Sequence, residues 1–259
     1  MLPNPDIDPV LFRLGPIAIR WYGLMYVFGL TAAFFMIKAR AAKHQVALSL
    51  DNLHDLILYA AVGVILGGRL GYILFYNLPY YIESPVKLLA VWEGGMSFHG
   101  GLLGVIVAVG VFCRRKGQTF YAIADLAAPA VPIGLGLGRL GNFINGELYG
   151  RATDVPWCMV FDRTGGGSLC RHPSQLYEAF LEGVLLFALV WAVGRRPRAP
   201  GTVFWAFIAG YGACRAFVEL FREPDAHLGL LAGMISMGQV LSLPMLALGL
   251  FMIWLVQRK

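Results

Sequence analysis

The chain has 259 residues, of which 58% are hydrophobic and 14% are charged, and its formal net charge is +6. Because soluble globular domains are about 25% charged, this composition excludes an ordinary soluble protein and predicts a polytopic membrane protein. The excess of positive charge then indicates how the chain is oriented in the membrane and does not indicate nucleic-acid binding. The first twenty residues combine acidic residues with prolines rather than a basic segment with an apolar core, so we expect no cleaved signal peptide.

Residues 1–20 are expected to form an irregular or interfacial segment, because their four prolines interrupt any long helix. Seven apolar stretches follow, and a helix needs about twenty such residues to cross a bilayer. We therefore predict an all-α polytopic membrane protein, a single integral membrane domain over residues 1–259 with about seven transmembrane helices. The predicted spans are residues 21–38, 53–76, 97–113, 121–145, 174–193, 201–222 and 233–256.

Basic residues in the links between spans predict the orientation. The links after spans one, three and five are rich in lysine and arginine, as is the C-terminus, whereas the other links also contain acidic residues. Lysine and arginine collect on the cytoplasmic side, so the C-terminus is predicted to be cytoplasmic and the N-terminus to be outside. The basic residues in question are Lys38, Arg40, Lys43, Arg114, Arg115, Lys116, Arg195, Arg196, Arg198, Arg258 and Lys259.

Two of the outside links are expected to be structured. Residues 77–96 contain prolines and the aromatic residues typical of a membrane interface, and residues 86–92 could form a short surface helix. Residues 146–173 form the longest link, which would make a small head on the outer side. Cys158 and Cys170 lie in this link and could form a disulfide if it is extracytoplasmic.

Three arginines are predicted to lie in the outer half of the membrane. Arg69, Arg139 and Arg215 each follow about fourteen to eighteen residues of an outward-running span, roughly 20–27 Å from the inner edge of a core about 30 Å thick. An arginine at mid-bilayer costs roughly 2.5–3.5 kcal/mol, so it needs a use or a partner. Arginine suits phosphate because its planar guanidinium can form two parallel hydrogen bonds. We interpret Arg139 and Arg215 as ligands of an anion, and a phospholipid head group is the anion available in the outer leaflet.

Other polar residues leave two readings open. The glutamates are more readily interpreted as partners that neutralise arginines than as catalysts. Arg69 could be a structural ion-pair partner, and His99, flanked by glycines, could cap a helix or act in catalysis. Two predicted helix faces each carry several of these residues at spacings of three and four: Tyr211, Arg215, Glu219 and Arg222 on span six, and Gln175, Glu178 and Glu182 on span five.

One glycine pattern is misleading. Gly136, Gly138 and Gly141 have the spacing of a dinucleotide-binding fingerprint. That pattern has meaning only between a strand and a helix, and the stretch before it is apolar without the alternation of a strand. We therefore reject a nucleotide site, and we find no close metal-binding motif in the sequence.

Five stretches along the chain together form a specific pattern: DPVLFRLGPIAIRWYG, GGMSFHGGLLG, GRLGNFINGELYG, HPSQLYEA and YGACRAFVELFREPD. With them the chain resembles the prolipoprotein diacylglyceryl transferase family over nearly its whole length. The resemblance implies a seven-helix enzyme of the bacterial inner membrane with a periplasmic head. It implies transfer of the diacylglyceryl group of phosphatidylglycerol to the lipobox cysteine thiol of a prolipoprotein, the first step of lipoprotein maturation. A thioether forms and glycerol phosphate is released, and we expect neither a cofactor nor a metal.

The resemblance also assigns site residues by motif position. The essential arginines of the family fall on Arg139 and Arg215, and its important histidine falls on His99. We add Arg69 to the candidates for substrate binding because of its depth in the membrane. The remaining functional or motif positions fall on Tyr22, Asn142, Glu147, Gly150, Tyr211, Glu219 and Arg222.

Two roles for His99 and two competing functions remain. His99 could accept the proton of the thiol, or it could order the lipid pocket. A transporter or lipid flippase would also keep charges in the membrane, but its polar groups would continue across the full depth. Here the inner half of the spans is almost free of charge, with Asp125 as the main exception. A seven-helix receptor or scaffold is supported only by the helix count and the outside N-terminus.

Overall fold

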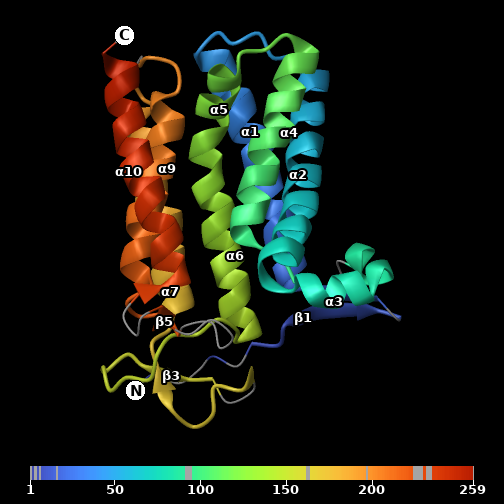
Figure 1. The fold of residues 1–259 in the computed structure, drawn as a ribbon, viewed down its shortest axis with the longest axis vertical. Helices are drawn as coiled ribbons and strands as arrows, with labels where there is room; N and C mark the ends of the chain where they lie inside the picture. Colours follow the sequence, from blue (N-terminus) through green and yellow to red (C-terminus); the bar gives the residue numbers. More distant parts are fainter. Residues whose placement is uncertain are drawn as a thin grey trace. The chain divides into compact units, whose positions relative to one another are not determined.

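The computed structural model describes residues 2, 5, 7–15, 17–90, 95–161, 164–196, 198–223, 230–231 and 235–258. They are mainly helical (Figure 1) and form two compact units, a first unit of Met1–Met36 with Ala127–Lys259 and a second unit of Ile37–Leu126. The predicted all-α polytopic fold is confirmed, because six described helices are long and apolar enough to cross a membrane. They are Trp21–Lys43, Leu50–Phe75, Phe98–Lys116, Phe120–Asn145, Ser174–Val193 and Met237–Gln257.

The sixth predicted span forms helix α9 (Thr202–Val218), which is apolar but only 17 residues long. The count of seven spans therefore stays a prediction. The expectation that this helix reaches residue 222 was wrong. After Val218 the backbone turns, and Arg222 pairs with Gly150 in a β-bridge instead of continuing the helix.

The second unit is built on two helices, α2 (Leu50–Tyr76) and α4 (Phe98–Lys116), which pack along each other through glycines. A Cβ atom added to Gly71 would lie 2.6 Å from the Cα of Gly100, and one added to Gly63 would lie 2.7 Å from the carbonyl oxygen of Gly104. Small residues thus let the two backbones approach closely, as in many membrane helix pairs. Helix α1 (Trp21–Lys43) begins in the first unit and ends in the second, and α5 (Phe120–Ala127) lies at the boundary.

The link between α2 and α4 is structured, as expected. It contains the short helix α3 (Leu78–Glu83) and the 3₁₀ turn η1 (Pro85–Leu89). The predicted surface helix over residues 86–92 is thus a 3₁₀ turn over part of that range, and residues 91–92 lie outside the described residues.

The described part of the first unit contains four long helical elements besides the start of α1. Helix α6 (Val131–Asn145) follows the 3₁₀ turn η3 (Ala128–Ala130). The next span runs through α7 (Ser174–Glu178), the π-helical segment η5 (Ala179–Leu185) and α8 (Leu186–Val193). Helix α9 packs closely on α10 (Met237–Gln257), since a Cβ on Gly212 would lie 2.7 Å from the Ser242 carbonyl oxygen.

Three small antiparallel hairpins complete the fold. Strand β1 (Val10–Leu14) pairs with β2 (Ile17–Arg20), β3 (Met159–Val160) with β4 (Cys170–Arg171), and β5 (Leu230–Leu231) with β6 (Ile235–Ser236). The irregular backbone expected for residues 1–20 was therefore wrong for residues 10–14 and 17–20, whereas their place at the membrane interface stays a prediction. No proline lies inside either of these strands, and Gly15 adopts a left-handed φ of 58° between them.

The two ends of the chain lie at opposite ends of the first unit (Figure 1). The N-terminal residues join the head, where the Leu2 amide donates a hydrogen bond of 2.9 Å to the carbonyl of Cys158. The head is the end at which α6 finishes and α7 begins. An odd number of passes between the termini fits this arrangement.

Candidate functional site

Two predicted arginines converge on one carboxylate oxygen. The Nε of Arg139, on α6, lies 2.7 Å from Oε2 of Glu178, and Nη1 of Arg215, on α9, donates to the same oxygen at 2.7 Å. A second carboxylate, Glu182, lies 3.5 Å from each of these two nitrogens. Guanidinium groups carried by separate helices therefore meet at one point, as the depth argument predicted.

The two glutamates come from an unusual stretch of helix. Glu178 is the last residue of α7, and Glu182 lies within η5, where the backbone takes the wider i→i+5 pattern of a π-helix. Such π-helical turns are rare and occur frequently at functional sites. Both side chains are completely buried. The face predicted from the spacing is thus confirmed, and these carboxylates are the partners of Arg139 and Arg215.

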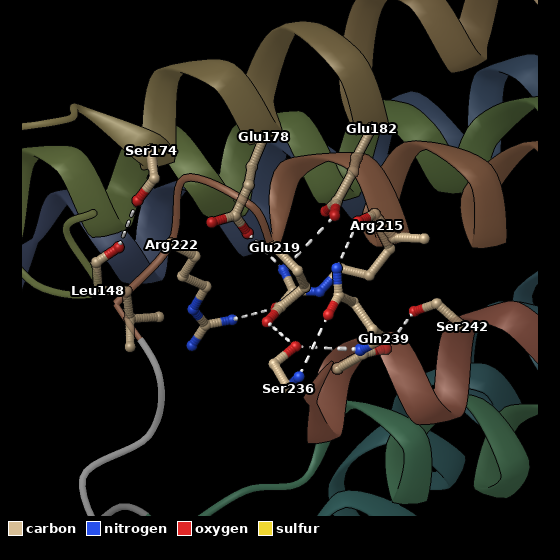
Figure 2. A network of polar contacts seen from close by, with 12 residues as sticks. Leu148, Ser174, Glu178, Glu182, Arg215, Glu219, Arg222, Ser236, Gln239 and Ser242 are labelled. Atoms are coloured by element: carbon tan, nitrogen blue, oxygen red, sulfur yellow. Dashed lines mark hydrogen bonds and ion pairs between the residues drawn. The ribbon is translucent and has the colours of Figure 1, made fainter. Parts of the chain in front are cut away.

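Arg215 is held from a second side as well. Its Nη2 lies 2.5 Å from Oε1 of Glu219, and Nη1 of Arg222 lies 3.7 Å from that same oxygen. Ser236, the N-cap of α10, donates its hydroxyl to Oε2 of Glu219 at 2.7 Å. Figure 2 shows Glu178 and Glu182 pointing to Arg215 from one helix, with Glu219 between Arg215 and Arg222. The contact of Arg215 with Glu219 agrees with the predicted face of span six, whereas Arg222 meets Glu219 from beyond the end of the helix.

Charge is balanced in this cluster, which we call the arginine–glutamate cluster (Arg139, Arg215, Arg222, Glu178, Glu182 and Glu219). Three positive groups face three carboxyl groups in a buried setting. Breaking a buried ion pair by removing one partner is strongly destabilising, because the other charge is left uncompensated. The cluster thus fixes the position of each guanidinium.

Arg139 differs from Arg215 in the donors that it keeps. Its recorded contacts with both glutamates are through Nε, and its two terminal amino groups donate no hydrogen bond to any described residue. The side chain is 14% exposed, whereas that of Arg215 is 9% exposed. Arg139 is therefore held along one edge and presents a pair of N–H donors that could bind an anion.

The C-terminal end of α6 is closed by amide contacts to Glu147. The helix stops at Gly146, which takes a left-handed φ of 71°. The side-chain amides of Asn142 and Asn145 both donate to Oε1 of Glu147, at 2.9 and 3.0 Å, and the amide of Gln175 donates to its backbone oxygen at 2.8 Å. Glu147 is thus held by three amides.

Gly150 is placed where no side chain fits. A Cβ atom there would lie 2.5 Å from the carbonyl oxygen of Phe221 and 2.7 Å from the Cβ of His172. The Gly150 amide donates to the carbonyl of His172, and the residue also forms the bridge with Arg222. Gly150 therefore lets the head pass close to the end of α9, which is a structural reason for the glycine.

The two predicted tyrosines lie in the same unit. Tyr22 packs on α6, since a Cβ on Gly141 would lie 2.8 Å from Cδ2 of its ring. Its hydroxyl lies 3.4 Å from that of Tyr26. Tyr211 is buried one turn before Arg215 and stacks on Phe207.

Arg69 belongs to the second unit and has a different environment. Its guanidinium donates to the backbone carbonyls of Lys87, Leu88, Ala90 and Gly95, at 2.5 to 3.3 Å. It also lies 5.0 Å from the centre of the Tyr81 ring. These contacts with carbonyls of the link support the structural alternative for Arg69.

His99 also belongs to the second unit, as the second residue of α4. The helix is capped by Ser97, whose hydroxyl accepts from the Gly100 amide at 3.2 Å. The alternative that His99 is the cap was therefore wrong. His99 is partly exposed and makes an edge-on contact with the Phe98 ring.

A disulfide and several hydrogen bonds stabilise the head around the residues that follow α6. A disulfide joins Cys158 and Cys170. The hydroxyl of Thr164, in the loop that this bond closes, donates to the carbonyl of Gly146. Arg171 donates to the carbonyl of Gly150 at 3.2 Å and lies over the Tyr149 ring. The loop thus holds the segment that contains Glu147.

Sequence reasoning missed Ser236 and gave Gln175, Glu178 and Glu182 no place among the site residues. Ser236 and Gln239 form a reciprocal capping box, and this S-x-x-Q pattern before an apolar run was a visible helix start. The helix spacing identified the face of Gln175, but not its bond to Glu147. The structure groups no three potential metal ligands among the residues it describes.

Comparisons with known proteins identify the family. Residues 9–255 match the sequence profile of the prolipoprotein diacylglyceryl transferase family. A phosphatidylglycerol--prolipoprotein diacylglyceryl transferase of Geobacter sulfurreducens is 63% identical, over 98% of this chain and 97% of the relative. Enzymes of the same name from Vibrio vulnificus and Legionella pneumophila are 55% and 52% identical, over 99% and 98% of this chain and 94% and 99% of the relatives. The chain belongs to the prolipoprotein diacylglyceryl transferase family.

Proposed function

We propose that this protein transfers the diacylglyceryl group of phosphatidylglycerol to the lipobox cysteine of prolipoproteins. The names of its relatives contain both substrates, and membership of the family supports the same reaction here. The observation that carries the residue assignment is the meeting of Arg139 and Arg215 at one oxygen of Glu178. Arg139, with its free donor pair, is the group that first holds the phosphate.

The chemistry is a displacement at a glyceryl carbon. A C–S bond forms between the substrate thiol and the diacylglyceryl carbon, while the C–O bond to the phosphate breaks and glycerol phosphate leaves. The leaving phosphate gains negative charge in the transition state. Preorganised donors aimed at developing charge often contribute more to catalysis than any other single effect. Arg139 and Arg215 provide such donors, and the buried glutamates keep both guanidiniums in place.

The thiol must lose its proton to react. A free cysteine has a pKa of about 8.5, so a base or a positive field is needed at neutral pH. His99 is our candidate for the base, on the strength of the resemblance. His99→Gln should then lower transfer strongly at neutral pH and less at alkaline pH, where the thiolate forms without a base. An equal loss at every pH would assign His99 to ordering the lipid instead.

The reaction is placed at the outer face of the bacterial inner membrane. The helices support a multi-pass membrane protein, and the relatives are bacterial. The disulfide in the head supports an oxidising compartment, because such bonds persist in the periplasm and are rare in the cytosol. Arg195, Arg196 and Arg258 follow helices at the far end of the first unit, as the positive-inside rule requires.

The test is a purified assay with two defined substrates. Protein in detergent or vesicles is incubated with phosphatidylglycerol and a peptide that carries a lipobox cysteine. We expect a mass increment of one diacylglyceryl group on the thiol, with release of glycerol phosphate. Absence of that product, with folded protein, would contradict the proposed function. Movement of the lipid between leaflets without transfer would indicate a flippase.

A further inference from the structure

Two buried side-chain oxygen atoms of α7 have no hydrogen-bond donor among the described residues, and neither has Oε2 of Glu182 in η5. Oε1 of Gln175 and Oε1 of Glu178 are inaccessible, and neither accepts a hydrogen bond from any residue that the structure describes. Both side chains are completely buried. Leaving a buried acceptor unsatisfied is unfavourable, and such groups in native proteins call for an explanation.

These oxygens belong to neighbouring side chains of one helix. Gln175 and Glu178 are three residues apart on α7, and side chains at this spacing lie next to each other with Cβ atoms about 5–6 Å apart. The other oxygen of Glu178 binds both Arg139 and Arg215. The amide nitrogen of Gln175 is bonded to the backbone of Glu147, which fixes the side chain. Glu178 therefore contacts the proposed phosphate-binding arginines, and Gln175 is its fixed neighbour on the same helix.

The chemistry of the two acceptor oxygens indicates which ligand groups they can bind. The two acceptors need donors, which a lipid head group can supply as hydroxyl groups or as an ammonium group. An ammonium group would lie near Arg139 and Arg215, which already share the Glu178 carboxylate, and near Arg222, which shares Glu219 with Arg215. Like charges in a buried site repel each other strongly. A neutral hydroxyl group donates a hydrogen bond without that cost.

We propose that Gln175 and Glu178 form the subsite that recognises the terminal hydroxyl groups of a phosphoglycerol head group. The phosphate lies at the arginines, and the hydroxyl groups donate to the two Oε1 atoms. This proposal rests on the proposed function and adds to it the residues that select the head group. A site built to bond a hydroxyl group discriminates strongly against an analogue that lacks it.

The test compares lipids that differ only in hydroxyl groups. Transfer to a lipobox peptide is measured with phosphatidylglycerol and with phosphatidylpropanol of the same acyl chains, which has no hydroxyl group. We expect kcat/KM for phosphatidylglycerol to be higher by roughly a hundredfold, since each lost bond is worth roughly tenfold. A lipid with one hydroxyl group, phosphatidylethylene glycol, should lie between them, and phosphatidylethanolamine should be poor.

A variant pair assigns the selectivity to the subsite. Gln175→Met removes the acceptor but keeps the length of the side chain, and it should lower the ratio of phosphatidylglycerol to phosphatidylpropanol by roughly tenfold. Ser174→Ala is the matched control. Ser174 is also completely buried and also donates to the segment after α6, at the carbonyl of Leu148. Its loss should lower transfer from both lipids equally and leave the ratio unchanged.

Two results would overturn the subsite. One is a wild-type ratio close to one, which needs no variant and so holds even if Gln175→Met does not fold. The other is a folded Gln175→Met protein that keeps the wild-type ratio. Failure of wild-type protein to transfer from phosphatidylglycerol would instead contradict the proposed function. Transfer that is indifferent to hydroxyl groups would contradict the subsite alone.

Discussion

Two arginine environments of the protein look alike in the sequence and differ in the structure. Arg69, in the second unit, donates to four backbone carbonyls of a single link. Arg139 and Arg215, in the first unit, are held by carboxylates from a neighbouring helix, and the terminal amino groups of Arg139 donate no hydrogen bond to any described residue. Depth in the membrane therefore does not show whether an arginine is structural or binds the substrate. The partners of its guanidinium group do show it.

The carbonyls around Arg69 and the carboxylates around Arg139 and Arg215 have different effects. Neutral carbonyl dipoles hold Arg69 by hydrogen bonds, and those bonds fix the backbone of the link. Carboxylates offset the charge of Arg139 and Arg215 and orient them through a few atoms. A guanidinium can then offer its remaining donors to a ligand without moving. This difference predicts separate effects on stability and on activity.

The largest effect is expected at the carboxylate-held arginines. Arg139→Ala and Arg215→Ala should each lower kcat/KM at least about a thousandfold, as for loss of a donor to developing charge. Lysine at either position should also be poor, because it loses the planar fork. The measurement is transfer to a lipobox peptide under single-turnover conditions. Near-normal activity in either alanine variant would break the comparison.

The next effect is expected at Glu178, which joins the two arginines. Glu178→Gln keeps the shape but removes the charge, so we expect a loss of roughly tenfold to a hundredfold in kcat/KM. Thermal stability should fall as well, because a buried ion pair is broken. Transfer kinetics and a melting curve on the same sample check both effects. A rise in activity with full stability would show that the carboxylate obstructs the phosphate.

A smaller effect on activity is expected at Arg69. Arg69→Ala leaves four carbonyls without their donor, and we expect a loss of about 3–5 kcal/mol in stability, as for other buried polar networks. The kcat/KM of the folded fraction should change by less than about tenfold. Melting temperature and active-site-normalised transfer separate the two effects. A catalytic loss as large as that of Arg139→Ala, in stable protein, would return Arg69 to the substrate site.

The smallest effect is expected at the disulfide of the head. Replacing Cys158 and Cys170 together by serine should lower stability by roughly 2–3 kcal/mol for a loop of this length. Transfer per folded molecule should stay close to that of the wild type. A reducing agent should lower the melting temperature of the wild type only. An equal fall in the melting temperature of the double variant would show that the disulfide does not contribute to stability.

Much of the fold could be predicted because the membrane demands long apolar helices. The predicted spans coincide with the observed helices to within a few residues at most ends, as at Ser174–Val193 and Phe120–Asn145. The small hairpins could not be predicted in the same way. Each depends on a few backbone bonds and on turns such as the one at Gly15, which give a weak signal in a short sequence.

The site could be predicted only in part, for a physical reason. Helix spacing places residues on a face, so the contact of Arg215 with Glu219 and the shared face of Glu178 and Glu182 followed from the sequence. Which face meets which arginine depends on packing between helices. The close approach of Gly136 to Gly183, where an added Cβ would lie 3.1 Å from a backbone atom, is such a packing feature. The π-helical segment is also a feature that helix spacing does not predict.

The central claim is that Arg139 and Arg215 bind the phosphate of the lipid. The most direct measurement is the affinity of the protein for phosphatidylglycerol and for diacylglycerol of the same acyl chains, without a peptide acceptor. Diacylglycerol lacks the phosphate and serves as the reference. Our account predicts that Arg139→Ala weakens binding of phosphatidylglycerol at least about tenfold, as for loss of a charged hydrogen bond, and leaves diacylglycerol binding unchanged. Equal affinities of wild type and variant for phosphatidylglycerol would contradict it.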